Sequence, residues 1–64
     1  MKYYQIFTFE NNLPEINFGD HDKELVLAEV QALRDSGVRA KDIKVVTLAS
    51  SDQKLVDATF KKFA

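Results

Sequence analysis

The only histidine of the chain lies in an acidic segment, residues 19–24, which reads Gly-Asp-His-Asp-Lys-Glu. Carboxylate oxygens and an imidazole are groups that bind divalent metal ions. Successive residues at a helix start point in different directions, however, and the segment is not part of a calcium loop, with its internal glycine and its distal glutamate. Acidic residues are also favoured at helix N-termini. We therefore expect helix capping here, and we predict no metal and no cofactor.

Three hydroxyl side chains, Thr47, Ser50 and Ser51, lie at the C-terminal end of a predicted strand and at the N-terminus of the predicted helix that follows it. In open parallel α/β sheets this is where ligands bind, and helix amides there can bind phosphate. No glycine opens the backbone to a ligand, and Asp52 would repel an anion. Capping of the following helix is the favoured interpretation, with anion binding as the alternative.

Basic residues are concentrated in the second half of the chain. Residues 1–32 hold two basic and six acidic residues, whereas residues 33–64 hold seven basic and four acidic ones. A group of them surrounds the turn after Gly37: Arg34, Arg39, Lys41 and Lys44. Such a turn could bind an anionic ligand or nucleic acid. A solvated end of the domain explains it too, because cations are favoured near a helix C-terminus.

Four aromatic residues lie close together near the N-terminus: Tyr3, Tyr4, Phe7 and Phe9. They fall on both parities of a predicted strand at residues 2–9, so this strand has two apolar faces. Core packing, a protein interface and base stacking are the three interpretations, and only Lys2 on this strand favours the last. We predict an interaction face, used for self-association or for another protein.

No pattern of a catalytic nucleophile is present. Cysteine is absent and no serine lies within a glycine-rich elbow, so we predict a protein that is not an enzyme.

Glu29 projects between Leu25 and Leu33 on a predicted helix face. Its carboxylate either reaches water past the neighbouring alanines or pairs with a basic residue at an interface.

The elements that must position these residues follow from periodicity and from turn residues. Strands are predicted at residues 2–9 and 43–49, the latter central in its sheet, and a weaker strand at 15–18 pairs back on the first. A helix is predicted at residues 21–36, ended by Gly37. A second amphipathic helix begins at Ser50 with a Ser-x-x-Gln capping box. No internal repeat is visible.

The predicted fold class is α/β or α+β, a small two-layer sandwich with the order β-(β)-α-β-α. It has two or three strands, with both helices on one sheet face and the strands at 2–9 and 43–49 parallel through a right-handed crossover. The other sheet face would be left bare. Residues 1–64 are expected to form a single domain.

Composition limits the function classes. The chain has 64 residues, 45% of them hydrophobic, and a formal net charge of −1, which argues against a general nucleic-acid binder. No apolar run could span a bilayer and no signal peptide is recognisable, so we expect a cytoplasmic protein without a membrane partner. We predict a non-catalytic interaction module or small regulator, most simply a homodimer. The alternative is an anion or nucleic-acid binder that uses the basic turn.

Overall fold

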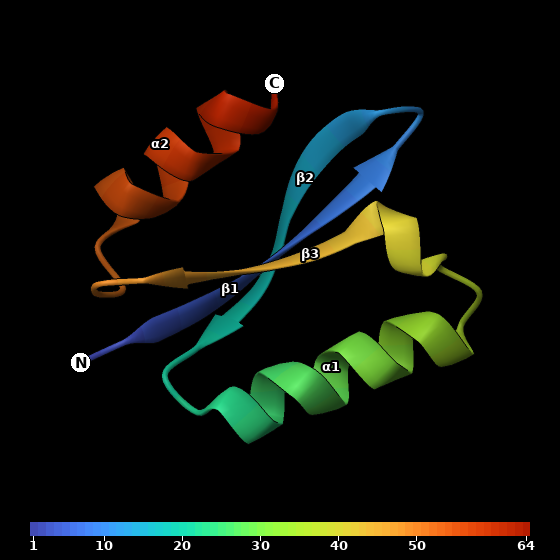
Figure 1. The fold of residues 1–64 in the computed structure, drawn as a ribbon, viewed down its shortest axis with the longest axis horizontal. Coiled ribbons are helices and arrows are strands. Elements are labelled where there is room, and N and C mark those ends of the chain that lie inside the picture. Colours follow the sequence, from blue (N-terminus) through green and yellow to red (C-terminus); the bar gives the residue numbers. More distant parts are fainter.

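A computed structural model describes all 64 residues and has the predicted composition of strands and helices. Its elements are β1 (Tyr3–Glu10), β2 (Leu13–Asp20), α1 (Lys23–Asp35), a short 3-10 helix η1 (Ala40–Asp42), β3 (Ile43–Leu48) and α2 (Gln53–Phe63). The α+β class with three strands is therefore confirmed. Figure 1 shows the two helices lying apart from each other, with the strands between them.

The first two strands form a tight hairpin. Asn11 and Asn12 both have positive φ, 53° and 67°, and connect the antiparallel pair Glu10 and Leu13. This is the two-residue turn whose twist matches that of the strands, and asparagine tolerates it better than most residues. The weak strand predicted at residues 15–18 is therefore real, and it extends over all of β2.

The three strands form one sheet in the order β2-β1-β3, and both neighbouring pairs are antiparallel. Two predictions are thus wrong. The strands at 2–9 and 43–49 were predicted to be parallel, and they are antiparallel; the strand at 43–49 was predicted to be central in the sheet, and it lies at an edge. The reason is the second strand of the hairpin. Because β2 reverses the chain before α1 begins, the helix connects β2 to β3, which run in the same direction on either side of β1.

The two helices cover opposite faces of this sheet, which corrects the prediction that both lie on one face (Figure 1). Phe7 contacts Phe63 of α2, with ring centroids 5.2 Å apart. Ile6 points to the other face, because successive strand residues alternate, and it lies beneath α1. Both Ile6 and Phe7 are completely buried. A central strand with apolar residues on both parities requires cover on both sides, so the fold has three layers.

Both helices begin at an aspartate and are shorter than predicted. Asp22 and Asp52 are the N-caps, and their carboxylates accept hydrogen bonds from the backbone N–H groups of Glu24 and Lys54. Gly37, with φ of 105°, ends α1 as predicted. The capping box predicted at Ser50 is not formed, because the side chain of Gln53 donates to Asp57 instead.

The units β2–α1 and β3–α2 are related by an offset of 30 residues. Their strands begin at residues 13 and 43, and their helices begin at residues 23 and 53. Burial is the same at each of the corresponding positions 23–33 and 53–63. β2 and β3 flank β1 in the same direction, and the helices that follow them lie on opposite faces of the sheet. The repeat escaped prediction because the aligned segments share only four identical pairs: Asp22/Asp52, Leu25/Leu55, Val26/Val56 and Ala28/Ala58.

Candidate interaction site

The aromatic residues of β1 are not a bare interaction face. β1 is the central strand, so both of its edges are hydrogen-bonded to neighbours. Phe7 is in the core, and Phe9 is half-buried with its ring centroid 5.5 Å from that of Phe63. Tyr3 and Tyr4 are also half-buried. Of the four residues of the predicted interaction face, Phe7 thus belongs to the core, and the other three keep part of their surface exposed on a strand that has no free edge.

The free edges of the sheet are the outer sides of β2 and β3. Which backbone groups point outward follows from the hairpin, since Glu10 and Leu13, flanking a two-residue turn, form a hydrogen-bonded pair. Along β1, successive residues direct their backbone N–H and C=O groups alternately toward β2 and toward β3. Phe7 therefore directs its backbone groups toward its β3 partner, Lys44. In β3 the backbone of Val45 and Thr47 therefore points away from the sheet.

Ile43 also points outward, but its N–H group already donates to the carbonyl of Ala40. The unpaired backbone groups in the middle of the β3 edge are thus the N–H and C=O groups of Val45 and Thr47. Val45 also exposes 42% of its surface, and Thr47 is exposed. An uninterrupted edge of this kind is a template for another strand.

The edge of β2 is blunted at several points. Pro14 has no N–H group, and by the same alternation it points outward, where proline is tolerated. The register of β2 against β1 shifts between the pairs Gln5/Gly19 and Phe7/Ile16, so Asn17 and Phe18 together oppose one residue and form a bulge. The side chain of Asn17 accepts the N–H group of Phe18 at 2.8 Å. Proline, a bulge and a locally satisfied amide are all features that prevent strand addition.

The bulge is stabilised from inside the sheet by Gln5, the only buried polar residue. Its side-chain amide lies 3.0, 3.1 and 3.2 Å from the carbonyl oxygens of Ile6, Asn17 and Phe18. Bulged residues leave carbonyl groups without ladder partners, and a buried amide that donates to them removes that cost. The bulge that blunts the β2 edge is thus stabilised by a buried side chain of the core.

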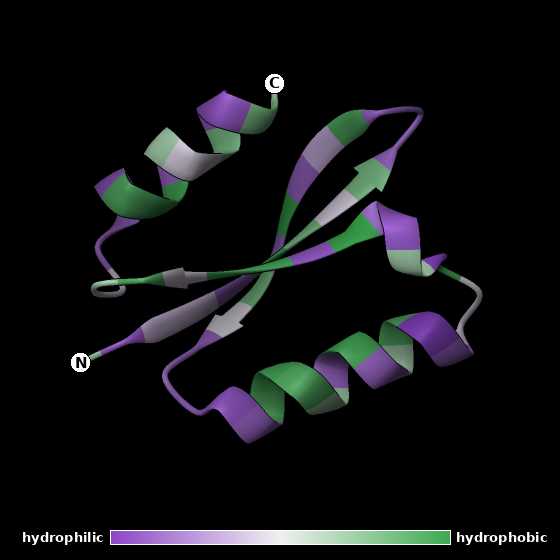
Figure 2. Cartoon of the chain, in the orientation of Figure 1, coloured by the Kyte–Doolittle hydropathy of each residue, from purple (hydrophilic) through white to green (hydrophobic).

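The two edges also differ in hydropathy. Figure 2 shows that β3 is hydrophobic over most of its length, whereas hydrophobic and hydrophilic segments alternate along β2. β3 reads Ile-Lys-Val-Val-Thr-Leu, with no proline and a single charge. Apolar residues on both parities are typical of a strand in the interior of a sheet. In one copy of this chain, β3 nevertheless lies at the edge.

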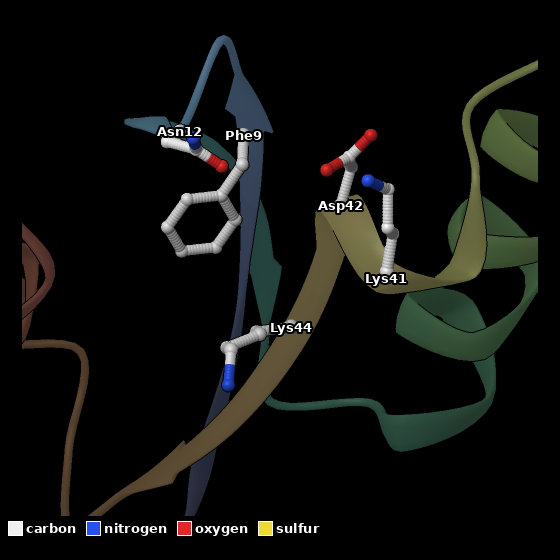
Figure 3. A pocket seen from close by; sticks show the side chains of 5 residues that line it. All are labelled: Phe9, Asn12, Lys41, Asp42 and Lys44. Atoms are coloured by element: carbon white, nitrogen blue, oxygen red, sulfur yellow. The ribbon is translucent and has the colours of Figure 1, made fainter.

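A shallow pocket of about 240 Å³ lies where η1 and β3 meet the hairpin end of the sheet. Figure 3 shows the side chains that line it: Phe9, Asn12, Lys41, Asp42 and Lys44. Lys44 extends away from the Asp42 carboxylate, and its Nζ atom lies 5.8 Å from the centroid of the Phe63 ring. Of the four basic residues predicted as an anion site, the pocket brings together Lys41 and Lys44. Arg34, in the last turn of α1, and Arg39, before η1, do not line it.

The remaining polar residues singled out by the sequence have structural partners. The Nδ1–H group of His21 donates to the carbonyl oxygen of Lys2 at 2.8 Å, and its ring meets that of Tyr3 edge-on. Asp20 accepts the N–H group of Asp22. Ser50 accepts the N–H group of Asp52, and it follows an antiparallel strand, so the parallel strand end on which the alternative of anion binding depended is absent.

No group of three or more histidine or acidic side chains is arranged to hold a metal ion. Glu29 is half-buried on the same helix face as Val26. Neither helix is long and apolar enough to cross a membrane.

Comparisons with protein-family models, with curated proteins and with solved structures found no match.

Proposed function

We propose that this protein is a non-catalytic interaction module that self-associates through the free edge of β3. The observation that carries the proposal is the contrast between an edge strand with the composition of an interior strand and a second edge that is blocked by Pro14 and a bulge. Small chains with small cores often gain stability by association, and only five of the 64 residues here are buried. The setting we propose is the cytoplasm.

The test is the molar mass in solution, measured by light scattering over a range of concentrations. The wild-type protein is expected to reach twice the 7.3 kDa of one chain. Val45→Pro removes an outward N–H group without breaking a bond to β1, so it is expected to give a folded monomer. Ile16→Pro is the matched control on the β2 edge, where the mass should not change.

Circular dichroism shows whether the proline variants are folded. If Val45→Pro unfolds, Val45→Lys takes its place, because a lysine at a strand edge discourages pairing without removing a donor. A wild-type protein that stays at 7.3 kDa at millimolar concentration would contradict the proposal. So would a folded Val45 variant with undiminished mass.

A second candidate function rests on the pocket of Figure 3. Two lysines and the side-chain amide of Asn12 surround a space large enough for a small anion, although Asp42 opposes the charge. Titration with inorganic phosphate, followed by amide chemical shifts, tests it. Binding is expected to weaken with salt and to disappear in Lys41→Glu, with Arg39→Glu as the control outside the pocket. Unmoved signals for Lys41 and Asn12 would remove this candidate.

A further inference from the structure

We infer that the partner on the β3 edge is a second copy of β3 in antiparallel orientation, related by a two-fold axis through Val46. This inference rests on the proposed function and assigns its geometry. The result is a continuous six-stranded sheet in the order β2-β1-β3-β3-β1-β2, in which the blunted β2 strands form both outer edges.

The register follows from the outward backbone groups. When a strand pairs with its own copy in antiparallel orientation, opposite residues must point the same way, so residues of the same parity face each other. The two-fold axis must then pass through a residue and not between two residues. Val45 and Val46 are the positions that keep most of β3 within the pairing.

An axis through Val46 places Val45 of each copy opposite Thr47 of the other copy. Every free N–H and C=O group of both residues then finds a partner, in four hydrogen bonds. An axis through Val45 would instead pair Thr47 with Ile43, whose N–H group already donates to Ala40. The carbonyl group of Thr47 would remain unpaired in that register, which argues for Val46.

The side chains are compatible with this arrangement. Val45 and Thr47 are β-branched, and such cross-strand neighbours stabilise a sheet. Val46 faces its own copy, and Lys44 lies opposite Leu48, so no like charges meet. The apolar residues on both parities of β3 then occupy an interior strand, where such residues belong. Only a copy of β3 offers this self-complementary pattern, since the β2 edge cannot accept a strand.

Single-cysteine variants test the register, because the natural chain has no cysteine. At a non-hydrogen-bonded pair the Cα atoms lie about 4.5 Å apart, within the range of about 4.4–6.8 Å that a disulfide bridges. Val46→Cys is therefore expected to form a covalent dimer under mild oxidation. Val45→Cys and Thr47→Cys should each remain single chains when oxidised alone and should form a heterodimer when mixed. Ile16→Cys on the β2 edge is the control for random collisions.

The outcomes separate this inference from the proposed function. Cross-linking of Val45→Cys alone, without Val46→Cys, would overturn the register and leave an edge dimer in place. A wild-type dimer by mass in which no β3 cysteine cross-links would overturn the β3 interface altogether. A wild-type monomer by mass would contradict self-association itself, whatever the cysteine variants do.

Discussion

The units β2–α1 and β3–α2 have the same order of elements, but the solvent-exposed edges of their strands differ. Their helices begin at equivalent aspartates, bury equivalent valines and repeat the same burial at eleven positions. Their strands diverge, since β2 carries Pro14 and a bulge, and β3 carries neither. The two units share the same order of strand and helix, and this order alone does not require a proline or a bulge in either strand. It indicates that one edge is kept from pairing and the other is available for it.

The largest effect that tests this comparison is expected at Gly19, which corresponds to Ala49 in the other unit. A Cβ atom at Gly19 would collide with the side chains of Gln5 and Tyr3, including a distance of 2.8 Å to Cε2 of Tyr3. Gly19→Ala is therefore expected to lower the free energy of unfolding by about 3 kcal/mol.

The reverse change in the second unit, Ala49→Gly, is the control. Ala49 is exposed and lies outside the helices and strands, so its loss should cost less than about 1 kcal/mol. Urea denaturation of both variants, at the same protein concentration, measures the difference between their free energies of unfolding. Equal destabilisation would mean that the bulge is not held tightly by Gln5 and Tyr3.

The next effect concerns the equivalent cores. Val26 and Val56 are 0% and 3% exposed, one on each helix. Each valine-to-alanine change removes buried methyl groups and leaves a cavity, with an expected cost of about 2 kcal/mol. The two values should be similar, because both valines are almost completely buried at corresponding positions. A large inequality would show that the two units are not energetically equivalent.

The smallest effect is expected at the helix caps. Asp22→Ala and Asp52→Ala each remove a side-chain acceptor of a backbone N–H group, at 2.9 and 3.0 Å. A loss of about 1 kcal/mol is expected for each. Replacement by asparagine, which keeps the acceptor, should restore most of the stability. Failure of the asparagine variants to do so would assign the effect to charge and not to capping.

The sequence predicted where the elements lie and that the strand at 15–18 pairs back on the first strand, but not how the strand at 43–49 pairs. Residues 43–49 look like an interior strand because Ile43, Val45 and Val46 leave no polar face. In one chain this is misleading, since the hairpin makes β1 central. Pairing is decided by the turn at Asn11 and Asn12 together with β2, whose proline and bulge obscure its alternation. The same misleading pattern is the basis of our proposal that β3 is the interaction edge.

The candidate site was likewise only partly predictable. Self-association was expected from an aromatic face, yet Phe7 is fully buried and β1 has no free edge. Which backbone groups point outward depends on the position of the hairpin turn and on the side of β1 that each neighbour occupies. Neither can be worked out from side-chain types alone. The bulge required knowledge of the register, although Gly19, directly after Asn17 and Phe18, is a signal that could have suggested it.

Amide hydrogen exchange measured at low and high protein concentration tests the central claim most directly. If β3 pairs with another β3, the N–H groups of Val45 and Thr47 will become protected as the concentration rises. The N–H group of Ile16, on the outer side of β2, will exchange at the same rate throughout. Fast exchange of Val45 and Thr47 at every concentration, or protection that rises at Ile16 instead, would contradict the account.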